Sequence, residues 1–325
     1  MQNPGDNISC RIVFLGTPDF AVESLKKLIE SKHQVVGVIT APDRQAGRGQ
    51  KLRLSPVKIE ANKFNIPVLQ PEKFKNSAFL EELRSLNADL FVVVAFRMLP
   101  EQVWNMPPMG TFNLHASLLP QYRGAAPINW ALINGEKETG ITTFFLNHQI
   151  DTGNILLQEK IAIHENMTAG ELHDILMETG SALTIKTVNA IVNQTIIPEP
   201  QSLSAYEKEI KPAPKIFKED CKIQWSQPAS LIHNLIRGLS PYPAAWTRFF
   251  DQNDNTFQIK IFRSEIHDSS PELDPGQVLI MHNGYLLVGT TSKTIRLLRI
   301  QPEGKRQMEV KDFLRGYRGQ ILKVE

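Results

Sequence analysis

Asn113 and His115 stand two residues apart at the end of an apolar run, where they could do chemistry together. Residues two apart on a β-strand face the same way, so both side chains would project from one face of a sheet. A histidine can take or give a proton near neutral pH, and an asparagine amide can donate a hydrogen bond to an oxyanion. The pair suits transfer of an acyl or formyl group between amines. The spacing alone also fits a strand-end histidine beside a capping asparagine.

A carboxylate follows the apolar run Ile141–Leu146, where Asp151 begins the tripeptide Asp-Thr-Gly. An aspartate beside a turn is most often a turn former. Close to His115, the same carboxylate would orient the imidazole or relay a proton to a leaving nitrogen. The spacing in the sequence sets no distance between the two groups.

Short apolar runs alternate with helical patterns through the first half of the chain. Strands separated by helices favour right-handed β-α-β units and a Rossmann-like, mostly parallel sheet. Ligands bind such sheets beyond the carboxyl ends of the strands, so we expect the loops after the strands, and after Asn113, to share one edge. The predicted strands are Arg11–Leu15, Gln34–Thr40, Ile66–Leu69 and Asp89–Ala95.

The pattern changes after a long amphipathic helix predicted at Thr168–Val192 and a proline-rich stretch. Short β-rich runs separated by Gly, Asn and Asp predict a small, OB-like β-barrel. The fold class is therefore α/β followed by this barrel, with a catalytic domain at residues 8–193, a linker at 194–215 and a C-terminal domain at 216–325. The β-rich runs are Trp246–Phe250, Phe257–Phe262, Val278–Met281, Tyr285–Val288 and Thr294–Ile300.

The composition is that of an ordinary globular protein, because 42% of its 325 residues are hydrophobic and 22% are charged. No apolar run approaches the ~18 residues that cross a bilayer, and the polar N-terminus lacks the apolar region of a secretory signal, so we expect no membrane association. Two distant cysteines, Cys10 and Cys221, fit a reducing cytoplasm. We expect a cytoplasmic monomer.

The segment Ala41–Lys58 is strongly basic, with no acidic residue after Asp43. It leaves the second predicted strand at the edge where the catalytic candidates should lie. It fits a solvated loop, or a mobile arm that grips phosphates. The C-terminal part from Glu209 onward also carries 17 Lys and Arg against 13 Asp and Glu, which fits chance or a polyanionic partner. The basic residues of the segment are Arg44, Arg48, Lys51, Arg53 and Lys58.

Several long motifs resemble the formyltetrahydrofolate-dependent formyltransferase family. The stretch after His115, SLLPQYRGAAPINWALINGEKETGITTFF, and the later Asp151 are similar to its active-site signature. FLGTPDFAVESL near the N-terminus and APDRQAGRGQKLRLSPVK at Ala41–Lys58 look like the methionyl-tRNA formyltransferase branch, as do SPYPAAWT and IQPEGKRQM in the C-terminal part. The resemblance therefore covers nearly the whole chain.

This resemblance implies transfer of the formyl group of 10-formyltetrahydrofolate to the amino group of methionyl initiator tRNA, without a metal. It implies Asn113, His115 and Asp151 as the catalytic residues. The folate pocket would be lined by Phe96, Arg97, Met98, Leu99, Ser117, Leu118, Leu119 and Pro120. The tRNA would be bound by Arg44, Arg48, Lys51, Arg53 and Lys215.

The main alternative is a nucleotide-sugar formyltransferase acting on a UDP-amino-sugar, which shares the NLH, SLLP and YRG features. A small sugar substrate has no use for an extended basic arm, so the segment around Arg48 favours tRNA. A nicotinamide dehydrogenase would need a G-x-G-x-x-G turn after the first strand, and FLGTPDFA does not supply it. A non-catalytic RNA-binding module would leave Asn113, His115 and Asp151 without a role.

Overall fold

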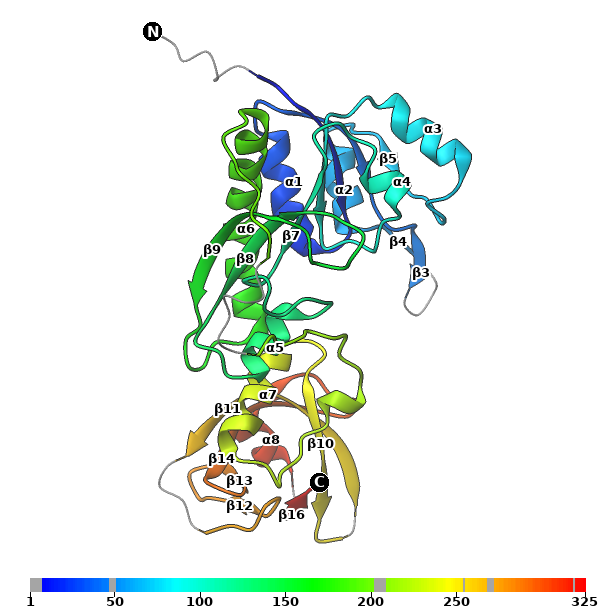
Figure 1. Ribbon diagram of the computed structural model, residues 1–325. Coiled ribbons are helices and arrows are strands. Elements are labelled where there is room, and N and C mark those ends of the chain that lie inside the picture. The colour runs from blue at the N-terminus through cyan, green and yellow to red at the C-terminus, as the bar shows by residue number, and fades with distance from the viewer. Residues whose placement is uncertain (1–7, 47–50, 202–208, 254, 268–271, 318) are drawn as a thin grey trace. The chain divides into compact units, whose positions relative to one another are not determined.

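The computed structural model describes residues 8–46, 51–201, 209–253, 255–267, 272–317 and 319–325 (Figure 1). The chain forms two compact units. The first contains the residues up to Gly124, Gly140–Ile161 and His173–Pro212, and the second contains Ala125–Thr139, Ala162–Leu172 and Ala213–Glu325. Two short stretches of the expected catalytic domain, 125–139 and 162–172, thus cluster with the C-terminal residues.

The first unit is built on a sheet in which seven strands of the described residues follow the order β5-β2-β1-β6-β7-β8-β9. Along this order each strand from β5 through β2, β1 and β6 to β7 pairs in parallel with the next, whereas β8 pairs antiparallel with β7. This confirms the expected mostly parallel sheet. The strands are β1 (Arg11–Gly16), β2 (Gln34–Ile39), β5 (Val68–Leu69), β6 (Leu90–Val94), β7 (Thr111–His115), β8 (Glu138–Phe145) and β9 (Ile155–Ala162).

Strand β6 lies at the centre of this sheet, and all five of its residues are buried. A continuous run of Leu, Phe and Val suits a strand covered on both faces. On one face, Phe91 and Val93 join a cluster with Leu83 of helix α3 (Ser77–Ser85). Burying a side chain of this size contributes about 1.5–3 kcal/mol. The apolar run therefore fixes the strand whose end precedes the loop at Phe96.

Helices flank the sheet or connect its strands. Helix α6 begins after Thr168, whose Oγ1 accepts a hydrogen bond from the Glu171 backbone N–H, while the Glu171 carboxylate accepts one from the Thr168 N–H. This reciprocal capping stabilises the first turn. The helices of this part of the chain are η1 (Asp19–Ala21), α1 (Val22–Ile29), α2 (Pro56–Lys63), α3 (Ser77–Ser85), α4 (Glu101–Trp104) and α6 (Ala169–Val192).

The basic segment at Ala41–Lys58 contains regular structure. Strands β3 (Arg44–Ala46) and β4 (Lys51–Arg53) pair antiparallel, and α2 begins directly afterwards. The Lys58 ammonium lies on α2, 2.5 Å from the Asp43 carboxylate and 2.5 Å from the Gln70 side-chain oxygen. Its hydrogen bond lowers the pKa of Asp43. Lys58 therefore anchors the base of the hairpin and does not belong to the free basic arm.

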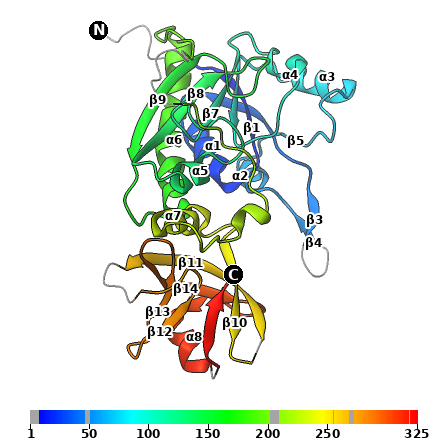
Figure 2. The ribbon, with the colours of Figure 1, turned by 60° about the horizontal axis from the view of Figure 1, so that its bottom comes forward.

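The second unit contains an antiparallel sheet with the order β12-β13-β14-β11-β10-β16 among its described residues, and β15 pairs with β14. A bridge between Gln277 and Lys323 joins the two ends, so the sheet is a nearly closed barrel, as expected (Figure 2). The strands are β10 (Ala245–Asp251), β11 (Thr256–His267), β12 (Val278–Ile280), β13 (Leu286–Gly289), β14 (Thr294–Pro302), β15 (Met308–Glu309) and β16 (Ile321–Val324).

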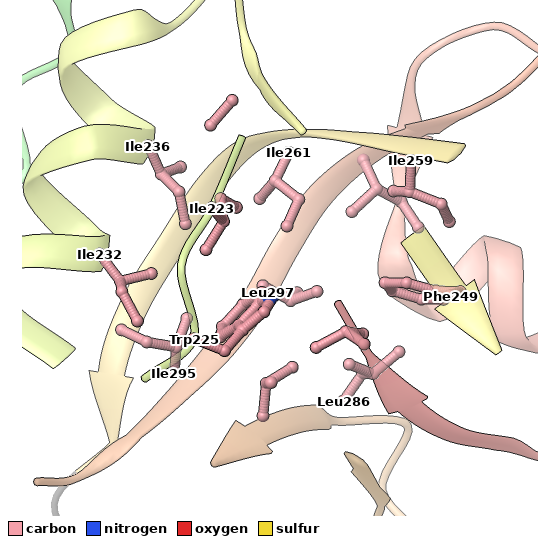
Figure 3. Close-up of a cluster of buried hydrophobic side chains, with 14 of the residues drawn as sticks. Ile223, Trp225, Ile232, Ile236, Phe249, Ile259, Ile261, Leu286, Ile295 and Leu297 are labelled. Atoms are coloured by element: carbon pink, nitrogen blue, oxygen red, sulfur yellow. The ribbon is translucent and has the colours of Figure 1, made fainter. Parts of the chain in front are cut away.

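The core of the barrel is filled by alternate strand residues and by helix α7 (Figure 3). Along β10, Ala245, Thr247 and Phe249 are buried while the residues between them are more exposed, which is the period-two pattern of a half-buried strand. Ile232 and Ile236 of α7 close the core. The helices of this unit are α5 (Pro127–Ile133), η2 (Glu219–Cys221), α7 (Ala229–Leu239) and α8 (Val310–Gly316).

A buried histidine makes the stability of this unit dependent on pH. His233 of α7 lies with Nδ1 3.1 Å from the Ser264 hydroxyl, and burial lowers its pKa, with a further contribution from the nearby Arg237. A hydrogen bond to the Glu165 backbone opposes this effect, as do the carboxylates of Glu165 and Glu265. Below about pH 6.5 the His233 imidazole binds a proton in the unfolded chain but stays neutral in the folded chain. The free energy of unfolding should therefore fall as pH drops below about 6.5.

We therefore expect His233→Gln to show a smaller fall in Tm between pH 7 and pH 5 than the unaltered protein. Each kcal/mol corresponds to roughly 2–4 °C in a chain of this size. Differential scanning calorimetry at both pH values measures the effect, with the exposed His282→Gln as the matched control. Parallel pH dependences in His233→Gln and the unaltered protein would contradict the assignment.

Among the described residues, no helix is long and apolar enough to span a bilayer. The same residues contain no group of three or more His, Cys, Asp or Glu side chains placed to hold a metal ion.

Candidate active site

Asn113 and His115 occupy β7, with His115 as its last residue. Asn113 lies opposite Val93 of β6 and His115 opposite Thr142 of β8, so the pair sits at the carboxyl end of a central strand. The His115 ring is buried and Asn113 is half-buried. Within the described part of the chain the Asn113 amide has no hydrogen-bond partner. It is therefore free to donate to a bound molecule.

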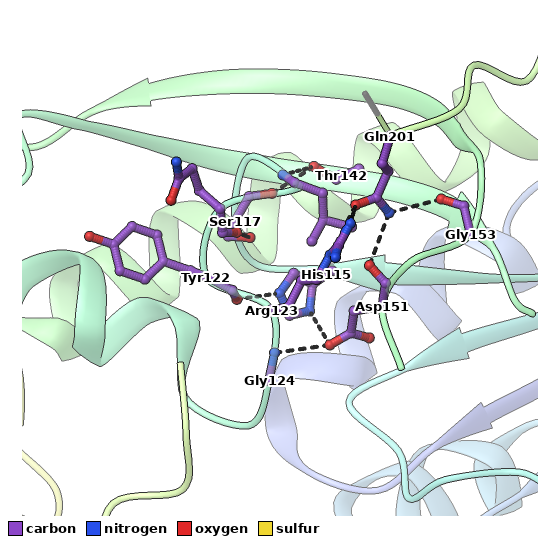
Figure 4. Close-up of polar contacts among 11 residues, drawn as sticks. His115, Ser117, Tyr122, Arg123, Gly124, Thr142, Asp151, Gly153 and Gln201 are labelled. Carbon is purple, nitrogen blue, oxygen red and sulfur yellow. Dashed lines mark hydrogen bonds and ion pairs between the residues drawn. The ribbon is translucent and has the colours of Figure 1, made fainter. Parts of the chain in front are cut away.

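The His115 ring is oriented by a backbone carbonyl. Its Nε2 lies 2.9 Å from the carbonyl oxygen of Tyr122, and because a carbonyl only accepts, we assign the Nε2 hydrogen to this bond (Figure 4). The other nitrogen, Nδ1, then faces Asp151, at 3.9 Å from its Oδ2. This separation suits an ion pair and exceeds a hydrogen bond. Nδ1 is therefore the nitrogen that can exchange a proton.

Asp151 lies in the loop between β8 and β9 with φ of 54°, in the left-handed region. Its Oδ2, the oxygen nearest His115, accepts a hydrogen bond from the Gly124 backbone N–H at 3.0 Å. Two residues on, Gly153 has no room for a side chain, because a Cβ there would lie 1.6 Å from the Phe145 carbonyl oxygen. The turn is therefore pressed against the end of β8, which directs the carboxylate toward His115.

The segment Ser117–Pro120 is held from within the protein. The Ser117 hydroxyl donates to the Gln121 carbonyl at 2.6 Å, and Thr142 Oγ1 donates to the Ser117 carbonyl and accepts from the Leu119 N–H. Leu118 packs against Gly140. The side chains of Ser117 and Leu119 are buried, so a ligand would contact this segment mainly through atoms other than these two side chains.

The segment Phe96–Leu99 follows β6. The Arg97 guanidinium lies 4.1 Å from the centre of the Phe74 ring and donates to the carbonyls of Pro71 and Glu72. Burial lowers its pKa. Leu99 is buried, whereas Met98 is 72% exposed. Arg97 thus uses these hydrogen bonds to hold its loop against the segment that follows β5, and Met98 is the side chain of the Phe96–Leu99 segment most open to a ligand.

The basic residues expected to bind tRNA lie in different parts of the structure. Arg44 and Arg53 are exposed and pair across the β3–β4 hairpin, and Lys51 lies in β4. Arg48 lies outside the described residues. Lys215 belongs to the second unit, is exposed, and has its ammonium 5.4 Å from the centre of the Phe217 ring.

Sequence reasoning missed four residues that surround the catalytic candidates. Tyr122 supplies the carbonyl for His115, Gly124 supplies the N–H for Asp151, and Arg123 and Gln201 bond to one another beside the Asp151 turn. Tyr122, Arg123 and Gly124 form the YRG motif within the family-like stretch. The motif was the available signal, but the contacts of Tyr122 and Gly124 use backbone atoms, which residue types do not reveal.

A histidine, a carboxylate and an amide without a hydrogen-bond partner among the described residues lie at the carboxyl edge of the sheet, which suits a group-transfer enzyme. The chain matches the family model described as formyl transferase over residues 10–188. The formyl transferase C-terminal domain model matches residues 215–318. A methionyl-tRNA formyltransferase of Bacteroides thetaiotaomicron is 52% identical over 95% of this chain and 96% of its own length. Another, from Flavobacterium johnsoniae, is 49% identical over 94% and 96%. The chain belongs to the methionyl-tRNA formyltransferase family.

Solved structures of more distant proteins share the fold. HypX from Aquifex aeolicus in complex with tetrahydrofolic acid has a TM-score of 0.63 at 16% identity, covering 94% of this chain and 47% of HypX. The N-formyltransferase from Helicobacter canadensis, in complex with folinic acid and dTDP-3-aminofucose, has a TM-score of 0.62 at 21% identity, covering 90% of this chain and 98% of that protein. At these identities the likeness concerns the fold alone.

Proposed function

We propose that this chain transfers the formyl group of 10-formyltetrahydrofolate to the amino group of methionyl initiator tRNA, with Asn113, His115 and Asp151 as its catalytic residues. The observation that carries the proposal is the arrangement at His115. Its Nε2 is held 2.9 Å from the Tyr122 carbonyl, its Nδ1 faces the Asp151 carboxylate at 3.9 Å, and the unbonded Asn113 amide belongs to the same strand face. The 52% identity to a relative named methionyl-tRNA formyltransferase supports the choice of acceptor.

The reaction begins when the amine nitrogen attacks the formyl carbon, forming a C–N bond and placing negative charge on the formyl oxygen. The Asn113 amide donates a hydrogen bond to this oxyanion, as does a protonated His115. Donors already in place act without reorganisation, so they stabilise the tetrahedral intermediate more than the flat formyl group. A single such donor is worth about 2.7–4 kcal/mol in comparable sites.

The intermediate collapses when the bond between the formyl carbon and the N10 atom of the folate breaks. One proton must leave the attacking nitrogen and one must reach N10, so the reaction is balanced by a single net proton transfer. Asp151 lies 3.9 Å from His115 Nδ1, so it can accept the proton through one bridging water molecule. The products are N-formylmethionyl-tRNA and tetrahydrofolate.

The folate lies, in this proposal, against the two loops that follow β6 and β7. In the proposal, the Ser117–Pro120 loop and the exposed Met98 supply its contacts, together with the neighbouring loop residues. The residues assigned to this pocket remain Phe96, Arg97, Met98, Leu99, Ser117, Leu118, Leu119 and Pro120. The formyl group is already activated on N10, so the chemistry needs no metal.

The tRNA is bound, in the proposal, by the β3–β4 hairpin and by the basic C-terminal domain. Arg44 and Arg53 lie exposed on the hairpin, and Arg48 falls between its two strands in the sequence, outside the described residues. We expect Arg48→Leu to lower kcat/KM for methionyl-tRNA by about tenfold or more, because one lost charged contact is worth about 1.5–3 kcal/mol. Steady-state kinetics and a folate-binding titration measure the effect. Arg84→Leu, at an exposed arginine of helix α3, is the matched control. Unchanged kcat/KM in Arg48→Leu would remove this assignment.

The direct test offers 10-formyltetrahydrofolate with methionine-charged initiator tRNA and measures formylmethionine on the tRNA. A parallel reaction offers a UDP-amino-sugar in place of the tRNA. Formylation of the tRNA alone supports the proposal. Transfer to the sugar alone would keep the formyl-transfer chemistry and overturn the proposed acceptor.

The proposal also covers the organisation of the chain. Residues 8–193 form the catalytic domain, 194–215 the linker and 216–325 the tRNA-binding domain, in a cytoplasmic monomer. The two free cysteines, both buried, suit a reducing compartment. Light scattering coupled to size exclusion tests the monomer against its mass of 36.7 kDa.

A further inference from the structure

Gln201 contacts the turn that carries Asp151, although it follows helix α6 in the segment expected to link the domains. Its side-chain Nε2 donates to the Asp151 carbonyl at 2.9 Å and to the Gly153 carbonyl at 2.8 Å (Figure 4). An amide nitrogen carries two hydrogens, so each carbonyl receives one. One side chain therefore holds both ends of the Asp151–Gly153 turn.

The orientation of this amide is set by Arg123. The Gln201 Oε1 accepts from Arg123 Nε at 3.1 Å and from Nη2 at 2.6 Å. Because a guanidinium can only donate, the Gln201 atom that faces it must be the oxygen, and the amide nitrogen must face the two carbonyls. Burial lowers the pKa of Arg123, and the negative charge of Asp151 opposes that effect. The charged arginine is thus supported by the carboxylate beside it.

The hydrogen-bonded pair of Gln201 and Arg123 is called the bracket. Residues 122–124 connect the bracket to the catalytic candidates His115 and Asp151. The Tyr122 carbonyl binds His115, Arg123 binds Gln201, and the Gly124 N–H binds the Asp151 carboxylate. Three consecutive residues therefore contact the histidine, the bracket and the aspartate in turn. A shift of Arg123 displaces the partners of His115 and Asp151 at the same time.

The Asp151 turn needs such support because its backbone is strained. A non-glycine residue at φ of 54° is in a less favoured backbone region, so contacts around it must hold it there. We propose that Gln201 and Arg123 are positioning residues for formyl transfer, which hold the Asp151 turn where its carboxylate faces His115. This inference rests on the proposed role of Asp151.

The discriminating variant is Gln201→Glu, with Gln201→Ala beside it. Glutamate keeps an acceptor for Arg123 but brings a carboxylate oxygen against the carbonyls of Asp151 and Gly153, where the amide donated. Misplacement by about 1 Å can cost 10²-fold in rate. We expect both variants to lower kcat by about 10- to 100-fold, with KM for the folate changed by less than about threefold. A merely structural role would lower Tm in both variants and leave kcat near its normal value.

Gln121→Ala is the matched control. Gln121 also ties the 117–124 loop to the segment after α6, since its Oε1 accepts from the Lys211 N–H at 2.9 Å and its Nε2 donates to the Glu209 carbonyl at 3.4 Å. Those bonds do not involve the Asp151 turn, so kcat should stay within about twofold. An equal loss in Gln121→Ala and Gln201→Ala would overturn the inference, because docking of the segment would then explain both.

The result also separates this inference from the proposed function. If His115→Ala and Asp151→Asn lose activity while both Gln201 variants keep normal kcat, the bracket is overturned and the catalytic assignment stands. If His115→Ala and Asp151→Asn both retain activity, the catalytic assignment fails and the bracket fails with it. A loss of kcat in Gln201→Glu and Gln201→Ala, with Gln121→Ala unchanged, supports the positioning role.

Discussion

His115→Ala is expected to lower kcat for formyl transfer by about 10²–10⁴, the range in which a positioned acid or base contributes. The change removes one of the two proposed donors to the oxyanion and the proposed proton carrier that faces Asp151. It also leaves the Tyr122 carbonyl without the ring nitrogen that it binds at 2.9 Å, which costs roughly 1–3 kcal/mol of stability. Single-turnover transfer to methionyl-tRNA measures the chemical step directly.

Two further variants separate chemistry from folding. Gln in place of His115 can still donate to the Tyr122 carbonyl, so His115→Gln should regain stability without regaining activity. His148→Ala is the matched histidine control, because that ring is 71% exposed and packs against Trp104. It should keep kcat within about twofold. Activity in His115→Gln near that of the unaltered protein would remove His115 from the mechanism.

The fold was predictable where the residue pattern depends on burial alone. The apolar run Asp89–Ala95 predicted a strand, and the structure has β6 there with all five residues buried. The β-rich run Trp246–Phe250 predicted a strand of the barrel, and the structure has β10 there. The β3–β4 hairpin was missed because its residues are basic and polar, so no apolar period marks it. The short β15 and β16 were missed for the related reason that two to four residues carry too little pattern.

The candidate site was predictable only where side chains supply the chemistry. Asn113, His115 and Asp151 can be named from residue type and family motif, and the structure brings His115 and Asp151 to 3.9 Å. The hydrogen bond that orients the histidine goes to a backbone carbonyl seven residues later, which any residue could supply. Gln201 lies 50 residues from Asp151, and a single glutamine in a proline-rich stretch gives no signal of such a contact.

Lys58 illustrates the opposite error, in which a residue type was overinterpreted. It was grouped with the basic arm on charge alone, yet its ammonium contacts Asp43 and Gln70 at 2.5 Å each. A charge that is paired at the base of a hairpin contributes little to the field that a polyanion meets. The exposed Arg44 and Arg53 are not paired with Asp43. They therefore remain the better candidates for binding tRNA on the described part of the hairpin.

Asp151→Asn should separate the charge of the carboxylate from its shape. Asparagine tolerates the left-handed backbone as well as aspartate does, and its side-chain oxygen can still accept from the Gly124 N–H. The substitution removes the electrostatic attraction between the Asp151 carboxylate and a protonated His115. At 3.9 Å and an effective dielectric constant of about 20, that attraction is about 4 kcal/mol, equivalent to about 10³-fold in rate.

Screening by the substrates and by water reduces this value, so we expect kcat to fall by about 10²–10³. The folate dissociation constant should change by less than about threefold, because the carboxylate acts on His115 and not on the folate rings. Asp174→Asn, an exposed aspartate on α6, is the matched control for loss of one negative charge. If Asp151→Asn kept normal kcat, the carboxylate would serve only the turn, and the proton would have to leave His115 by another route.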